Sequence, residues 1–208
     1  MQDPTAPTEL TAEDYRQRLQ AIYRLVEQHP PQAGMWIRPL LQDRESPVRS
    51  AAIVALGTLR DQESFADLVA CLAAPTSHER RNTVLALLAL GGERVRSRLV
   101  QARAHEANPS VCQVILRGLS TFADDREVID VLIEELQAPD EDVRATAAVA
   151  LAKMQARAAL PALQHMLQTD TNQETSIQGL WVANSSVAQM AIAAILSGQQ
   201  PPELDWPS

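Results

Sequence analysis

Aromatic residues are scarce in this 208-residue chain, making up 3% of it, and there are only two Cys. Two thiols cannot form a disulfide framework, so we expect a reducing, cytoplasmic compartment. Positive charge is in deficit, with 18 Lys and Arg against 26 Asp and Glu. This acidic balance disfavours non-specific binding to nucleic acid. The longest uncharged stretch, Thr175 to Pro202, contains several amide and hydroxyl side chains, so we expect no membrane insertion.

A short motif recurs along the chain. Ser-Pro-Val-Arg ends at Arg49 and Glu-Asp-Val-Arg ends at Arg144, and both are followed by Ala-rich segments. In weaker copies the same position falls at Arg81, Cys112 and Ala188. The steps between these positions are 32, 31, 32 and 44 residues. Three nearly equal steps predict a stacked repeat protein.

Each repeat is predicted to form two helices. Apolar residues at helical spacing, such as Leu68, Val69 and Leu72, mark the first helix. The second helix begins at the motif, where Ser46 before Pro47 and Asn108 before Pro109 are suitable caps. Small Ala side chains would allow neighbouring helices to approach closely. We therefore predict an all-α protein, a right-handed α-solenoid of about five helix pairs.

The repeats define the expected organisation. A capping helix over 11–30 is predicted to cover the first repeat, because the end of a solenoid must be shielded from water. The predicted segments are a disordered N-terminus 1–10, a repeat domain 11–198 with repeats at 34–61, 62–92, 93–123, 124–155 and 156–198, and a flexible tail 199–208.

The Val-Arg motif, the Ala-Ala and Ala-Leu steps and the short period resemble the HEAT repeats of the phycobilisome lyase and phycobilisome-degradation group. The resemblance extends over about Met35 to Ser197. The resemblance implies a protein partner, either a phycobiliprotein or a second HEAT subunit. Some members of the group attach or detach a bilin. The chain carries no catalytic motif that could be assigned to that chemistry.

The recurrent Arg has two interpretations. In HEAT proteins the matching Arg commonly joins a ladder with acidic residues, and Asp43, Glu141 and Asp142 lie near suitable places. Alternatively, Arg49, Arg81 and Arg144 form a basic row on the inner surface, suited to carboxylates of a partner or of a bilin.

Cys112 replaces the motif Arg. At this position its thiol could face the inner surface, which makes it the candidate for a reactive thiol. The second thiol, Cys71, lies in an apolar run and is expected in the core. The dipeptides His78-Glu79 and His105-Glu106 resemble the iron-binding pairs of HEAT-type deoxyhypusine hydroxylases. Only the first pair is in register, so we expect no di-iron site.

The last repeat carries an insert near 169–184 that includes Trp181. Trp181 is either a cap over the solenoid end or an anchor for a partner. We predict a non-catalytic protein-binding scaffold or adaptor that needs no cofactor, for a phycobiliprotein or photosynthetic assembly. Its partner-binding candidates are Arg49, Arg81, Cys112, Arg144 and Trp181. The alternatives are a bilin lyase subunit acting on a phycobilin, and an iron or iron–sulfur related factor.

Overall fold

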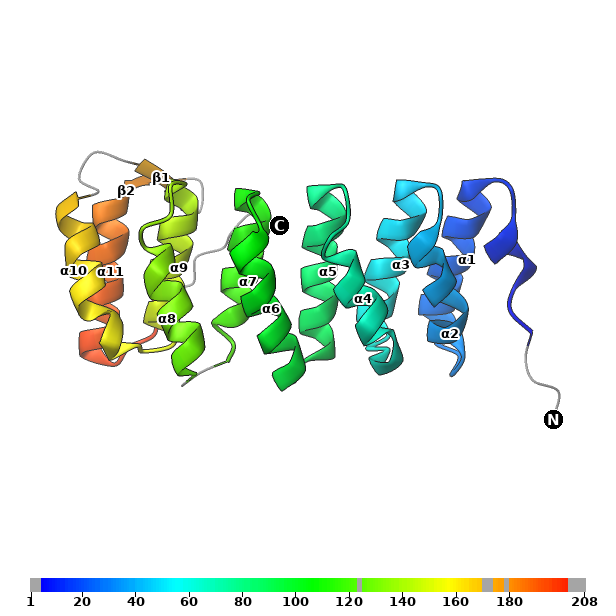
Figure 1. Cartoon of the computed structure of the whole chain (residues 1–208), viewed down its shortest axis with the longest axis horizontal. Coiled ribbons are helices and arrows are strands. Elements are labelled where there is room, and N and C mark those ends of the chain that lie inside the picture. Colours follow the sequence, from blue (N-terminus) through cyan, green and yellow to red (C-terminus); the bar gives the residue numbers. More distant parts are fainter. Residues whose placement is uncertain (1–4, 123–124, 170–173, 178–179, 202–208) are drawn as a thin grey trace. The chain divides into compact units, whose positions relative to one another are not determined.

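The computed structural model describes residues 5–122, 125–169, 174–177 and 180–201, with side chains except at 174–177 and 180–185. Within this range the chain is helical apart from two short strands (Figure 1). The elements are η1 Thr8–Thr11, α1 Tyr15–Gln28, α2 Ala33–Ile37, η2 Arg38–Gln42, α3 Ser46–Thr58, η3 Gln62–Ser64, α4 Phe65–Cys71, α5 Ser77–Leu90, α6 Glu93–His105, α7 Pro109–Leu119, α8 Arg126–Glu135, α9 Glu141–Lys153, η4 Arg157–Ala159, α10 Leu160–Thr169, β1 Glu174–Ile177, β2 Leu180–Ala183 and α11 Asn184–Ser197.

These elements form two compact units, unit 1 (Met1–Ala102) and unit 2 (Arg103–Ser208), and the division falls within α6. After α1, the helices follow one another along the chain in pairs. The prediction of an all-helical repeat solenoid is therefore confirmed. The right-handed sense of the superhelix stays a prediction.

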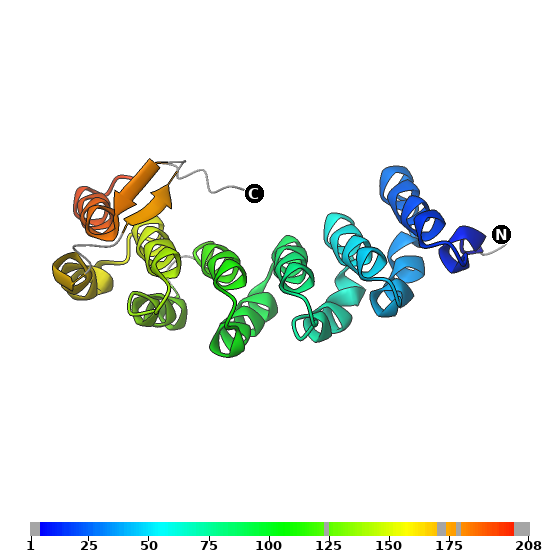
Figure 2. The same ribbon diagram turned by 90° about the horizontal axis from the view of Figure 1, so that it is seen from above.

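Unit 1 has two layers of helices. One layer contains α1, α3 and α5, which we call the B helices of this unit, and the other contains α2 and α4 (Figure 2). The middle B helix, α3, packs against both α1 and α5. Leu56 and Leu87 are fully buried between these layers. The approach of α3 to α5 is close because Gly57 has no side chain: a Cβ there would lie 2.7 Å from Cα of Ala86.

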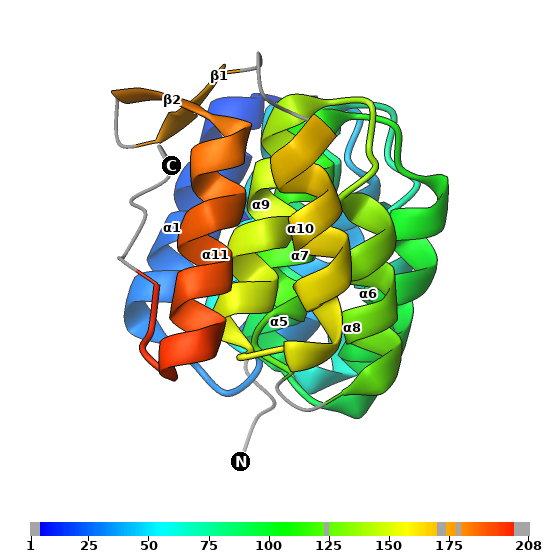
Figure 3. The ribbon, with the colours of Figure 1, turned by 90° about the vertical axis from the view of Figure 1, so that its left-hand side faces the viewer.

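Unit 2 repeats this arrangement. Its B helices are α7, α9 and α11, with α9 packed against both neighbours, and α8 and α10 lie in the other layer. The strands β1 and β2 form an antiparallel pair in which Glu174 lies opposite Ala183. This hairpin occupies the predicted insert, and β1 contacts α9. Figure 3 shows the hairpin at the end of α11 where that helix begins. The insert is thus part of the B-helix layer of unit 2.

The ends of several helices differ from the prediction. Residues 8–10, which the sequence places in a disordered N-terminus, begin η1, and Leu10 is 5% exposed. Asn108 caps α7 as predicted, because its side chain accepts from the backbone N–H of Val111. Ser46 does not cap α3; its hydroxyl donates to Glu79 at 2.8 Å instead. The prediction for 202–208 lies outside the described residues.

Candidate functional site

Where the motif position is Arg, its side chain binds the loop that precedes its own helix. Nη1 of Arg49 donates to the carbonyls of Asp43 at 2.9 Å and Arg44 at 3.1 Å. Arg144 repeats this geometry with Ala138 at 2.8 Å and Pro139 at 3.0 Å. Each guanidinium therefore satisfies two backbone acceptors that would otherwise lie beside a closely packed helix start. This geometry supports the structural interpretation of Arg49 and Arg144.

The same geometry corrects the predicted register in α5. Arg80 donates to the carbonyls of Ala74 at 3.0 Å and Pro75 at 3.4 Å, six and five residues before it, as Arg49 and Arg144 do. The sequence places Arg81 at this position, but the structure places Arg80 there.

Helix α1 belongs to the same series. Arg18 donates to Ala12 at 2.7 Å and to Glu13 at 2.9 Å, again six and five residues earlier. The helix interpreted as a cap from the sequence is therefore equivalent to the B helices α3 and α5. The equivalent Arg residues of unit 1 are 31 residues apart in the sequence, from Arg18 to Arg49 and from Arg49 to Arg80.

Two of these Arg residues also contact a carboxylate of the next repeat. Arg18 forms a two-pronged contact with Asp43, at 2.7 and 2.8 Å. Arg49 donates to Glu79 from Nε at 3.0 Å and from Nη2 at 2.8 Å. Burial acts to raise the pKa of Asp43, but the hydrogen bonds from Arg18 and from the N–H of Glu45 outweigh it and lower that pKa. Unit 1 therefore contains the Arg–carboxylate ladder expected from the sequence. In each contact the carboxylate belongs to the repeat that follows the Arg.

Neither thiol lies on the surface. Cys112 is 3% exposed, and its sulfur donates to the carbonyl of Glu106 at 3.4 Å. Cys71 is 9% exposed, as expected of a core residue. Burial raises the pKa of the Cys112 thiol, and the nearby Arg103 only partly opposes this. The expectation that Cys112 could face the inner surface is wrong, because the sulfur takes over the loop-binding role of the Arg that it replaces.

The His-Glu dipeptides do not assemble a metal site. Glu79 is 1% exposed and accepts from Arg49 and Ser46, while His78 contacts the side-chain amide of Asn82 at 3.2 Å. Among the residues whose side chains are described, no cluster of three His, Cys, Asp or Glu could hold a metal ion. In the first dipeptide, Glu79 thus belongs to the Arg–carboxylate ladder and His78 lies on the surface of the B helix α5.

Trp181, the remaining candidate, lies in β2, but its side chain is outside the described part of the structure. The choice between a cap and a partner anchor stays open at this residue.

The B helices of unit 1 present a feature that the sequence analysis missed. Five residues after the ladder position, each of them exposes a large apolar side chain: Tyr23 is 62% exposed, Val54 49% and Leu85 45%. These three residues, which we call the apolar row, lie on α1, α3 and α5 in equivalent places. Equivalent exposed residues on three consecutive repeats indicate a continuous surface rather than scattered exceptions.

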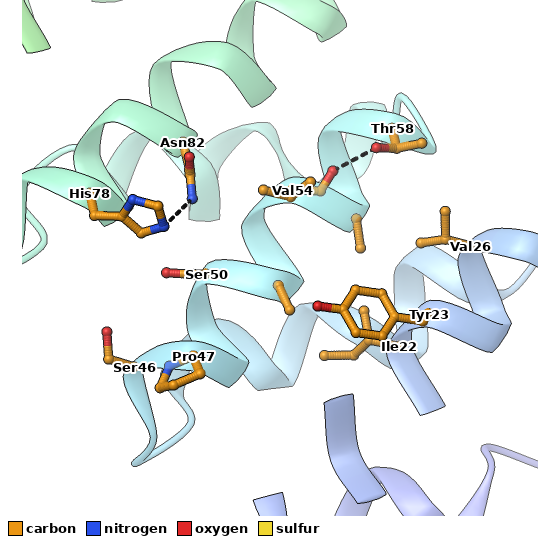
Figure 4. Close-up of a pocket in the computed structure, with 12 residues that line it drawn as sticks. Ile22, Tyr23, Val26, Ser46, Pro47, Ser50, Val54, Thr58, His78 and Asn82 are labelled. Atoms are coloured by element: carbon orange, nitrogen blue, oxygen red, sulfur yellow. Dashed lines mark hydrogen bonds between the residues drawn. The ribbon is translucent and has the colours of Figure 1, made fainter. Parts of the chain in front are cut away.

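A groove of about 490 Å³ lies beside the apolar row (Figure 4). Tyr23 and Val54 both line it, on α1 and α3. Ser50 and Asn82 add a hydroxyl and an amide along the groove. Its residues are Ile22, Tyr23, Val26, Ser46, Pro47, Ser50, Ala51, Val54, Ala55, Thr58, His78 and Asn82. None of these lining residues is Arg or Lys, so a ligand would meet apolar and neutral polar groups.

Unit 2 shows a covered counterpart of the apolar row. Five residues after Arg144 stands Val149, which is 6% exposed although its equivalent Val54 is half exposed. It lies on α9, the helix against which β1 packs. The next equivalent position, five residues after Cys112, is Arg117. Exposed large apolar side chains at this repeat position are therefore found in unit 1 and not at the two positions compared in unit 2.

The apolar row could have been found from the sequence if the register had been right. Counting five residues on from Arg18, Arg49 and Arg80 leads to Tyr, Val and Leu. Counting from Arg81 leads instead to Ala86, which is buried. The missing signal was the helix start, because a helix that begins at Ser77 puts Arg80, not Arg81, in the fourth position.

The profile of the HEAT repeat family matches residues 8–89 and 96–182. The chain belongs to the HEAT repeat family. No membrane-spanning candidate was found among its described helices, since none combines the necessary length with sufficient apolar character. Among curated protein sequences, none matches the chain.

Solved structures support the fold. An engineered protein superimposes with a TM-score of 0.56 at 20% identity, covering 94% of this chain and 96% of its own. A designed armadillo repeat protein gives 0.52 at 19% identity, covering 90% of this chain and 97% of its own. The complex of CpcE and CpcF of phycocyanin lyase from Nostoc sp. PCC7120 gives 0.46 at 14% identity, covering 94% and 97%. At these identities the first two likenesses establish the solenoid fold alone.

Proposed function

We propose that this chain is a non-catalytic protein-binding scaffold and that the apolar row of unit 1 is its main contact surface. The observation that carries the proposal is the exposure of Tyr23, Val54 and Leu85 at equivalent positions of three B helices. Fully burying an exposed apolar side chain contributes about 1.5–3 kcal/mol of transfer free energy, and covering these half-exposed side chains would contribute roughly half of that each. A repeated strip of this kind suits a protein partner, because each repeat adds contact area without a deep enclosure.

The groove alone favours a protein over a bilin. A phycobilin carries propionate carboxylates, which are best held by Arg through paired charge-assisted hydrogen bonds. The groove lining contains neither Arg nor Lys. Arg49 and Arg144 are already engaged by loop carbonyls, and Arg49 also by Glu79. We therefore place the scaffold ahead of the bilin lyase subunit.

For the partner, we propose a phycobiliprotein or another component of a photosynthetic assembly. This finer proposal rests on the resemblance of the Val-Arg repeats to the phycobilisome lyase group. The proposed location is the cytoplasm, the reducing compartment indicated by the two thiols. Titration of the purified chain with phycocyanin tests the partner, and a complex whose formation needs the apolar row is expected.

The contact surface is tested with two matched charge substitutions. Val54→Arg places a cation in the apolar row, whereas Met35→Arg does so at an equally exposed apolar residue of α2, which is 54% exposed. We expect partner capture to be lost in the first variant and kept in the second, with unchanged helicity in both. Equal capture by both variants would contradict the proposal.

The alternative lyase activity has a separate test. The purified chain is mixed with a phycobilin, with and without an acceptor phycobiliprotein, and its absorption spectrum is followed. The scaffold proposal predicts no bilin absorption band on the purified chain and no transfer. Bilin transfer to the acceptor would establish the lyase subunit instead.

A further inference from the structure

We propose that the apolar row of unit 1 takes an extended, uncharged segment of a partner protein, in the way that β1 lies against α9 in unit 2. This inference rests on the proposed function and specifies the chemistry of its partner. It starts from a comparison of equivalent residues within one chain. Val54 and Val149 occupy the same repeat position, yet one is 49% exposed and the other 6%.

The element that lies against α9 in unit 2 has a defined chemistry. The strands β1 and β2 supply extended backbone, and β1 lies against α9. From Thr175 to Ala183 the sequence contains no charged residue. It is rich in residues that favour extended structure, among them Ile177, Trp181 and Val182. The chain itself thus provides an example of an uncharged, extended segment lying against a B helix.

The surface of unit 1 matches such an occupant in charge. The groove beside the apolar row is lined by apolar and neutral polar groups, with His78 as its one imidazole. A charged segment would lose its hydration there without gaining an opposite charge, which is unfavourable. An uncharged apolar segment would lose no such hydration. Charge complementarity therefore selects an uncharged occupant.

Polar groups along the groove favour an extended backbone. A strand at the surface of a helix layer leaves some of its N–H and C=O groups without strand partners. The hydroxyl of Ser50 lines the groove between apolar residues and can pair with such a group, whereas the amide nitrogen of Asn82 already contacts His78 at 3.2 Å. The apolar row would then contact alternate side chains of the segment, which point to one face of a strand.

The test uses the full chain and, as the probe, a synthetic peptide of Thr175–Ala183 with blocked termini, so that the peptide carries no charge. Binding of the fluorescently labelled peptide is measured by anisotropy for the unmodified chain and for Val54→Arg, Leu85→Arg and Met35→Arg. We expect the two row variants to weaken binding about tenfold or more and the α2 variant to leave it within about twofold. Circular dichroism shows whether each variant keeps its helicity.

Peptide variants separate side-chain from backbone recognition. Trp181→Lys with Val182→Lys in the peptide puts charge on the segment, and Val182→Pro removes a backbone N–H and restricts the chain. Both changes are expected to abolish binding. Equal binding of the charged peptide, or binding unaffected by Val54→Arg because the peptide replaces the hairpin on α9, would overturn the inference.

The outcome also distinguishes this inference from the proposed function. If the peptide fails to bind while Val54→Arg still abolishes capture of a folded partner, the row is a contact surface and the extended occupant is wrong. If neither peptide nor partner depends on Val54, both proposals are wrong. Concentration-dependent self-association that Val54→Arg abolishes would identify a second copy as the occupant and would overturn the inference.

Discussion

Replacing Gly57 by Ala tests how closely the repeats of unit 1 are packed. In an isolated helix this change would stabilise by about 1 kcal/mol, because Gly has the greater freedom in the unfolded chain. In α3, however, the new Cβ would lie 2.7 Å from Cα and 2.8 Å from Cβ of Ala86. The first of these atoms is backbone, so α3 and α5 must move apart. Overpacking of this kind costs about 1–3 kcal/mol, so we expect the gain to be cancelled or exceeded, with a net loss of up to about 2 kcal/mol.

Urea unfolding followed by circular dichroism measures this change, with Ala86→Gly and the double variant completing a cycle. Removing Cβ of Ala86 relieves one of the two clashes but leaves the contact with its Cα. Gly57→Ala should therefore cost less in the Ala86→Gly background than in the unmodified chain, and should still not stabilise fully. A gain of about 1 kcal/mol from Gly57→Ala alone would refute the close packing.

Three further predictions follow from the ladder and the buried thiol. The pKa of Asp43 is lower in the folded chain than in the unfolded chain, so its carboxylate stabilises the fold above the unfolded pKa. This contribution is lost as the pH falls through the folded pKa. The Asp43→Asn variant should therefore lose less thermal stability than the unmodified chain when the pH is lowered below about 4. Arg80→Ala should cost about 1–3 kcal/mol and Arg81→Ala less than about 0.5 kcal/mol, and equal losses in urea unfolding would contradict the register. The Cys112 thiol should react with a disulfide reagent far more slowly in the folded chain than in urea, and comparable rates would show that it is accessible.

The repeat register was largely readable from the sequence. Val48 and Val143 precede the motif Arg, and both are buried at equivalent sites because the first turn of each B helix faces the layer beneath. The error arose at Arg80-Arg81, where two adjacent residues of the same type fit nearly equal steps. Only the loop carbonyls, which no sequence pattern marks, decide between them.

The exposed surface was less predictable, because exposure depends on what lies over a residue. Val54 and Val149 have the same residue type and the same place in their repeats, and their exposure differs more than fivefold. The difference accompanies β1, a short strand within an insert that breaks the repeat. Cys112 shows the converse case, since its place in the motif suggested a reactive surface thiol and its burial makes it part of the loop contact.

The most direct test of the central claim is site-specific crosslinking. A photoreactive amino acid is introduced at position 54 of the apolar row, or at position 35 on α2 as the matched exposed control, in the full chain in its native cell. The account predicts that a single partner protein is crosslinked through position 54 and not through position 35. Crosslinks of equal yield from both positions, or from position 35 alone, would contradict it.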